Sequence, residues 1–412
     1  MKKSLGPIAI HQSLKRRRHI QGVPPFSPRV AAGKTSGMGD SATSSLRETW
    51  RRFTGFVIPT NMKRRSFLRM VGGTAGASTF GLDKLLADFR ATDDVVSRVA
   101  GLPRRMLGRT KREVSIIGFP GLALMRTDPA EANKAVKDAF DRGVNYYDNA
   151  PAYGKDGECE IKMGPALASL DRSKIFLACK TKARDAAGAQ KELERSLARH
   201  QTEYFDLYQM HHLVTLDDVN RALGPGGAVE TFRKARESGK IRAIGFSAHS
   251  TKAALAALRM FDFDTAMFPI SFAEYYLRDF GKAVLDAAAE RGTAVVAIKP
   301  MCLGSWLPGV PKTREWWYRT TETPEEIAVA LRFSLSLKGV VAGIPPSFVD
   351  LLEKAVAAAR DLQPATAQDR DQLREFAKKC QSLFLREDTQ PEPPAAVGLG
   401  IPYPDRLHEC MG

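Results

Sequence analysis

The chain has 412 residues, 43% of them hydrophobic, which is enough for one barrel-sized domain of about 250 residues with extensions or for two smaller domains. Its net charge of +16 comes from residues 1–112, which hold 23 Lys and Arg against 6 Asp and Glu, whereas the remainder holds 39 against 40. The near-neutral remainder argues against nucleic-acid binding, and five cysteines without a CxxC pair argue against a zinc site or a disulfide framework.

Residues 1–61 carry charge, Pro, Gly and Ser without a sustained hydrophobic period, a composition typical of a disordered leader. The basic run Lys15–Arg18 is interpreted as a solvated part of that leader, and a nucleic-acid or membrane patch is the alternative.

From Met62 the chain reads MKRRSFLRMVGGTAGASTFGL, with paired Arg64 and Arg65 before a mildly apolar Gly- and Ala-rich stretch. Residues 62–90 thus resemble a bacterial twin-arginine export signal, which implies the Tat machinery as a partner and a periplasmic location, with a cytoplasmic location as the alternative. We expect no stable membrane span, since the apolar stretch 70–82 is short and glycine-rich. Such signals lie near the first residue, so we expect Met62 to be the true start. A basic amphipathic helix lying on the folded domain is the other interpretation.

Residues 88–104 are predicted to be a linker, and apolar runs then alternate with helical patterns along the chain. This alternation predicts a parallel sheet, and eight repeats predict closure into a single α/β (β/α)8 TIM barrel over residues 104–361. An open doubly wound sheet is the alternative, but no GxGxxG follows the first strand. Residues 362–412 are predicted to be a short helical extension, 366–384, and a Pro-rich tail. The predicted strands are 114–119, 145–148, 175–180, 204–210, 243–247, 265–268, 294–298 and 340–344. The predicted helices are 129–143, 158–170, 187–200, 228–238, 251–258, 279–291, 324–336 and 348–359.

Polar residues follow three consecutive predicted strands. Asp148 and Tyr153 stand in NYYDNAPAYG, between a strand and a helix, while Lys180 ends IFLACK and His211 ends YFDLYQMH. The carboxyl ends of barrel strands form the rim where chemistry takes place, so we expect the four side chains to meet there. Taken singly, each also fits an ordinary structural role. His212 should point away from the lumen if His211 points in, and no metal site is expected.

The segments MLGRTKREVSIIGF, DNAPAY, CKT, YFDLYQMHH and KIRAIGFSAH resemble the aldo-keto reductases over about residues 104–359. The resemblance implies an NADPH- or NADH-dependent oxidoreductase that reduces a small carbonyl substrate. It also implies Tyr153 as proton donor, with Lys180 lowering the phenol's pKa, Asp148 holding Lys180, and His211 orienting the carbonyl oxygen. A catalytically weak or inactive nucleotide-binding barrel, acting as a sensor or scaffold, is the alternative function.

The same resemblance implies that Ser247, Lys299, Pro300 and Ser347 bind the cofactor, the last beside a helix start suited to phosphate. Three positions depart from the family pattern: Ala248 replaces an asparagine, Met267 a glutamine and Ile298 an aromatic residue. The absence of Lys and Arg from 344–352 leaves the choice between NADPH and NADH open.

The predicted loop 301–323 is long enough to act as a lid or binding loop. Its aromatic residues either wall the substrate pocket or cover the barrel mouth; they are Trp306, Trp316, Trp317 and Tyr318. Cys179 precedes Lys180 on one strand, so we expect its thiol to be buried outside the lumen.

Overall fold

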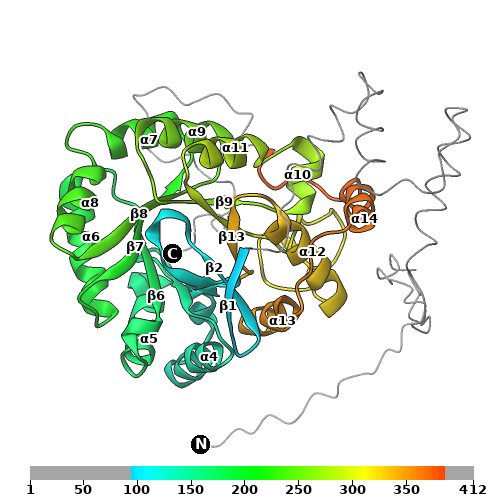
Figure 1. The fold of residues 1–412 in the computed structure, drawn as a ribbon, viewed down its shortest axis with the longest axis horizontal. Helices are drawn as coiled ribbons and strands as arrows, with labels where there is room; N and C mark the ends of the chain where they lie inside the picture. The colour runs from blue at the N-terminus through cyan, green and yellow to red at the C-terminus, as the bar shows by residue number, and fades with distance from the viewer. Residues whose placement is uncertain (1–93, 386–412) are drawn as a thin grey trace, which may run out of the picture. The chain divides into compact units, whose positions relative to one another are not determined.

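The computed structural model describes residues 94–385, which form a barrel of eight parallel strands surrounded by helices (Figure 1). The predicted leader, export signal and Pro-rich tail lie outside these residues. The strand order is β13-β10-β9-β8-β7-β6-β5-β4, and the alternation of strands and helices confirms the predicted architecture. The barrel strands are β4 (Phe119–Pro120), β5 (Tyr146–Asp148), β6 (Phe176–Thr181), β7 (Phe205–Leu213), β8 (Ile241–Ala248), β9 (Thr265–Pro269), β10 (Ala294–Ile298) and β13 (Val340–Ile344).

Backbone hydrogen bonds across Gly118 close the barrel between its first and last strands. The Gly118 N–H donates to the Gly343 carbonyl at 3.0 Å, and the Gly343 N–H donates to the Ile116 carbonyl at 2.8 Å. A Cβ on Gly118 would lie 2.4 Å from Cδ1 of Ile344, so a side chain at this crossing would force the Ile344 side chain to move. The single strand predicted over 114–119 is wrong in extent: it is split by this crossing into β3 (Glu113–Ser115) and β4.

The predicted linker is also wrong from residue 95 onwards, because β1 (Val95–Val99) and β2 (Leu102–Met106) form an antiparallel hairpin that continues into β3. The hairpin lies across the amino-terminal end of the barrel (Figure 1). There the buried Arg105 guanidinium donates to the carbonyls of Leu335 and Val340, at 2.9 and 3.2 Å. These contacts give Arg105 its hydrogen bonds and cover the barrel floor.

All eight predicted barrel helices are present, together with α7 and α10, which were not predicted. The extension α14 ends at Ala377 instead of residue 384. Within residues 94–385 no helix combines the length and apolar character needed to cross a bilayer. The helices are α4 (Pro129–Asp141), α5 (Glu158–Ala168), α6 (Ala186–Arg199), α7 (Leu216–Leu223), α8 (Ala228–Glu237), α9 (Thr251–Met260), α10 (Phe272–Arg278), α11 (Lys282–Glu290), α12 (Pro324–Ser336), α13 (Val349–Arg360) and α14 (Ala367–Ala377).

Local sequence explains the helix starts, and burial explains the orientation of the helices. In α4, Asp128 and Glu131 form a reciprocal capping box before a proline-led first turn. The buried face of α4 repeats at helical spacing through Ala132, Ala135, Val136 and Ala139. Short 3-10 turns lie at Gly108–Thr110, Gly121–Arg126, Lys155–Gly157 and Arg172–Lys174, and β11 (Cys302–Gly304) pairs with β12 (Arg319–Thr320) beyond the rim.

A separate cluster of apolar side chains fills the barrel lumen. Tyr146, Phe176, Leu207 and Val296 belong to it and are fully buried. The barrel interior is thus a packed core, and a cavity lies towards the carboxyl ends of the strands.

Candidate active site

A cavity at the carboxyl ends of the strands brings together the four residues predicted at the rim. Asp148 ends β5, Tyr153 follows on the next loop, and Lys180 and His211 lie near the ends of β6 and β7. All four line the same open cavity, whose space free of protein atoms is about 630 Å³ together with the solvent at its mouth. The structure therefore brings these four side chains together at the rim, and their chemical roles stay a prediction.

Lys180 is the centre of the group. Its ammonium lies 2.5 Å from Oδ2 of Asp148 and 3.1 Å from the Tyr153 hydroxyl, and it donates to the Asn149 carbonyl at 3.0 Å. The Lys180 side chain is fully buried, so its charge depends on these three oxygen partners. The site therefore holds a cation directly against a phenol oxygen.

Asp148 is buried with its lysine partner. Burial raises the pKa of the Asp148 carboxyl above its ordinary value, and the charge and hydrogen bond of Lys180 act in the opposite direction. The Gln209 side-chain amide donates to the other carboxylate oxygen at 3.4 Å. Gln209 was not predicted, although it stands two residues before His211 on the same strand, a spacing that places both on the lumen side.

His211 faces Tyr153 across the cavity. The two ring centroids are 5.6 Å apart and the ring planes are nearly perpendicular. Burial, followed by the charges of Lys180 and Lys182, lowers the pKa of His211 well below 6.5, so the imidazole is neutral at pH 7. Nδ1 of His211 is buried and has no hydrogen-bond partner within the described part of the chain. A neutral imidazole carries one N–H, which is available to a ligand oxygen.

Of the predicted cofactor residues, Ser247, Lys299 and Ser347 line the cavity, whereas Pro300 lies beside it and is not a lining residue. The Ser247 hydroxyl oxygen accepts a hydrogen bond from the His212 N–H at 2.8 Å, which leaves its own proton to donate. Lys299 has a φ of 58°, a left-handed conformation that is uncommon outside glycine, directly after β10.

Met267 and Ile298, two of the three departures from the family pattern, also line the cavity. Their apolar side chains present no hydrogen-bonding group there.

His249 is a cavity residue to which sequence reasoning assigned no role. Its Nε2 lies 3.5 Å from the Lys299 ammonium nitrogen, and its ring is 4.5 Å from that of His212. The two-residue spacing from Ser247 was a usable signal, because Ser247 lies near the end of β8 and His249 directly follows that strand. His212 itself does not line the cavity. Its left-handed backbone, with φ of 60°, interrupts the side-chain alternation of the strand at this point.

The long loop after β10 contributes three of its four predicted aromatics to the cavity wall: Trp316, Trp317 and Tyr318. Trp306 instead donates its indole N–H to the Trp316 carbonyl at 2.7 Å. Arg314 of the same loop binds Asp350 in the first turn of α13 with two hydrogen bonds, at 3.0 and 2.6 Å. This places a guanidinium beside residues 344–352, which the sequence of that segment alone could not reveal.

The Aldo/keto reductase family model matches residues 116–375. A 6-dehydroglucose reductase from Novosphingobium aromaticivorans is 34% identical over 173 residues, which cover 38% of this chain and 55% of that protein. In general, the chain spans about half the length of the curated relatives it matches.

Two solved structures share the barrel. The holo form of an aldo-keto reductase from Bacillus halodurans is 25% identical with a TM-score of 0.56, and the match covers 67% of this chain and 96% of that one. An aldo-keto reductase from Klebsiella pneumoniae in complex with NADPH is 21% identical with a TM-score of 0.51, covering 65% and 92%, and shows the fold alone. The family model covers more than half of this chain, which therefore belongs to the aldo/keto reductase family.

Proposed function

We propose that this protein is a nicotinamide-dependent carbonyl reductase that converts an aldehyde or ketone to an alcohol. The observation that carries the proposal is the Lys180 ammonium, which contacts both the Tyr153 hydroxyl and the Asp148 carboxylate at the edge of an open cavity. That arrangement suits proton donation to an oxygen that gains negative charge during the reaction.

Tyr153 is the proton donor in this proposal. As a carbonyl oxygen gains electrons, the phenol O–H transfers its proton to it, and the ammonium 3.1 Å away stabilises the phenolate that remains. Asp148 holds the ammonium in place, since a buried cation needs a paired anion. His211, neutral and opposite Tyr153, donates one ring N–H to the same oxygen and so orients the carbonyl.

Several polar groups of the cavity suit a nicotinamide dinucleotide, whereas Met267 and Ile298 offer it no hydrogen bond. The Ser247 hydroxyl has a proton to donate to the carboxamide of the nicotinamide, close to Tyr153 and Lys180. Ser347 precedes α13, whose N-terminal N–H groups have no side-chain cap among the described residues and suit a phosphate. Lys299 and the backbone at Pro300 complete the proposed contacts. NADPH or NADH, when bound, supplies the hydride that reduces the carbonyl carbon.

The aromatic wall indicates the substrate class. Trp317 and Tyr318 line the cavity with flat apolar faces, which suit sugar-like or apolar carbonyl compounds. The similarity to a protein named 6-dehydroglucose reductase supports including oxidised sugars in a substrate panel.

The test is oxidation of NADPH and NADH, followed by absorbance, with a panel of aldehydes, ketones and oxidised sugars. We expect turnover of at least one compound and its loss in Tyr153→Phe. Mass spectrometry of nucleotide released from the purified protein identifies the cofactor. Full activity of Tyr153→Phe would reject the proposed role of this residue.

A second candidate function is a nucleotide-binding sensor or scaffold with little turnover. Met267 and Ile298 favour it, because both line the cavity without offering a hydrogen bond to a carboxamide. Tight nucleotide binding without turnover of any carbonyl compound would favour this candidate over the reductase.

We further propose that the protein is exported by the twin-arginine route to the periplasm. This proposal rests on the KRRSFL sequence that begins at Lys63. Because the route carries folded proteins, a cofactor bound in the cytoplasm would travel with the chain.

A further inference from the structure

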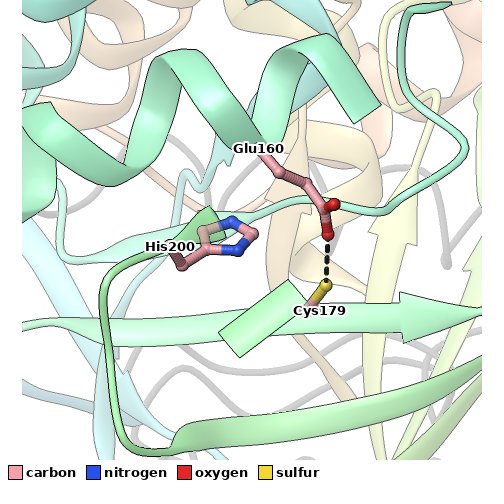
Figure 2. A group of neighbouring side chains, drawn as sticks. All are labelled: Glu160, Cys179 and His200. Atoms are coloured by element: carbon pink, nitrogen blue, oxygen red, sulfur yellow. Dashed lines mark hydrogen bonds between the residues drawn. The ribbon is translucent and has the colours of Figure 1, made fainter. Parts of the chain in front are cut away.

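A buried polar cluster lies directly behind the strand that carries Lys180. Glu160 of α5, Cys179 of β6 and His200 at the end of α6 face one another, and their potential ligand atoms all lie within 4.8 Å (Figure 2). Each of the three is at most 1% exposed. Carboxylate, thiolate and imidazole are all zinc ligands, so the other contacts of each residue decide what the cluster does.

Both the carboxylate and the thiol already have partners. One Glu160 oxygen accepts from the Arg199 guanidinium at 3.1 Å, and the other accepts from the Cys179 thiol at 3.4 Å. Burial, followed by the Glu160 charge, raises the pKa of Cys179 well above its ordinary value, so the sulfur keeps its proton. A cysteine that binds a metal must lose that proton. These contacts fit a satisfied hydrogen-bond network better than a metal site.

The partners of His200 define its protonation. Nδ1 lies 2.9 Å from the Ser196 carbonyl, which can only accept, so Nδ1 carries the proton. Nε2 lies 3.2 Å from the Asn149 amide nitrogen. That amide is oriented by its other contacts, because its oxygen accepts from the Ala150 N–H and its nitrogen donates to the Cys159 carbonyl. His200 is therefore neutral and accepts a hydrogen bond from Asn149. Burial lowers the pKa of His200, which also favours the neutral imidazole.

Asn149 connects this histidine to the candidate active site. Its backbone carbonyl accepts from the Lys180 ammonium at 3.0 Å. Its side-chain amide contacts the backbones of Ala150 and Cys159. These two residues in turn hold Tyr153, because the Tyr153 N–H donates to the Ala150 carbonyl at 3.0 Å and the Cys159 N–H donates to the Tyr153 carbonyl at 3.2 Å. A shift of the Asn149 amide would thus move both the ammonium and the phenol.

We propose that His200, acting through Asn149, is a positioning residue for the Lys180 ammonium and the Tyr153 hydroxyl. The inference rests on the proposed function, because those two groups perform the proton transfer there. Removal of the Nε2 acceptor leaves the Asn149 amide nitrogen with the Cys159 carbonyl and the weak acceptor Sδ of Met163, 3.5 Å away, and the amide relaxes to recover a full hydrogen bond. Misplacement of the reacting groups by less than 1 Å slows the chemical step more than it weakens binding.

The test compares His200→Leu with His200→Gln, whose side-chain oxygen can still accept from Asn149. We expect His200→Leu to lower kcat about tenfold, on the scale of one lost hydrogen bond, with KM and cofactor Kd changed by less than about twofold. His200→Gln should retain at least half of the wild-type kcat. Leu197→Ala, a packing loss on the same helix, is the matched control and should lower Tm without lowering kcat.

Asn149→Ala provides a second route if His200→Leu folds poorly. It should lower kcat by a similar factor, and the double variant should lose no more than the larger single loss. A wild-type kcat in both Asn149→Ala and His200→Leu, or equal damage by Leu and Gln at position 200, would overturn the inference. So would one equivalent of bound metal that disappears in Cys179→Ala.

A crystal structure of His200→Leu separates this inference from the proposed function. A distance above 3.5 Å between the Lys180 ammonium and the Asn149 carbonyl supports positioning, and an unchanged distance refutes it. If the wild-type protein reduces no carbonyl compound, or Tyr153→Phe stays fully active, the proposed function fails while this structural measurement still decides the role of His200.

Discussion

Replacement of Lys180 by Met tests the chemical step most directly. Methionine approaches the length of the lysine side chain without its charge, and removes a fully buried ammonium that lies 3.1 Å from the Tyr153 hydroxyl. A hydrogen bond to a charged group contributes about 1.5–3 kcal/mol, which corresponds to roughly a 10- to 150-fold loss of turnover. Tyr153→Phe removes the proton donor itself and should lower turnover by about 10²–10⁴-fold.

The double variant is the informative measurement, made as the single-turnover rate of cofactor oxidation with a saturating carbonyl substrate. Tyr153→Phe and Lys180→Met act on the same proton transfer, so their losses should not multiply. Cofactor affinity should barely change in Tyr153→Phe, because the phenol is proposed to contact the substrate oxygen. A double variant whose loss equals the product of the single losses would refute the assisted-phenol mechanism.

A stability control accompanies this cycle. Lys180→Met leaves the Asp148 carboxylate, 2% exposed, without its cation, and breaking a buried pair in this way costs about 3–5 kcal/mol. Asp148→Asn in the same chain should recover much of that stability in urea unfolding without recovering turnover. Recovery of both would show that Lys180 acts only through folding.

Three further predictions concern acid stability, cofactor choice and export. Burial lowers the pKa values of His200 and His211 in the folded protein, so as pH falls the unfolded chain takes up protons at these histidines before the folded chain does. The free energy of unfolding should therefore fall as pH drops below about 6.5. Urea unfolding at pH 7.5 and 5.5 measures this loss, which should be smaller in His200→Gln; an equal loss in both proteins would contradict the expectation. No Lys or Arg lies in 344–352, so titration by fluorescence should give NADPH and NADH affinities within about tenfold, whereas a hundredfold preference for NADPH would require a basic partner from elsewhere. Lysine at both Arg64 and Arg65 should retain the protein in the cytoplasm, and normal periplasmic yield of that variant by cell fractionation would reject the twin-arginine signal.

Arg314 is a specific candidate for the basic residue that would bind the 2′-phosphate if NADPH were strongly preferred. Arg314 reaches the first turn of α13, but two carboxylates, Glu322 and Asp350, already bind its guanidinium. The Glu322 hydrogen bonds, followed by opposing burial, raise the pKa of Arg314 above its ordinary value. If a strong preference for NADPH is found, Arg314→Ala should remove it more than Lys299→Ala does.

The sequence by itself determined the parts of this protein that depend on local pattern. Apolar runs followed by helical periods correctly predicted the eight barrel helices and seven of the strands, because strand and helix periods are local properties. The rim residues followed from the same pattern. Parallel strands bring their carboxyl ends to one edge, so Asp148, Lys180 and His211 had to lie close together once the barrel closed.

Only the tertiary structure decided the contacts between segments far apart in the chain. The first strand is split because closure across Gly118 depends on Gly343, and the supposed linker pairs as a hairpin whose Arg105 contacts Val340, 235 residues away. His200 meets Asn149 across 51 residues, although its own sequence reads only as the end of a helix. No local period encodes such pairs, because they depend on how the packed helices and loops meet around the barrel.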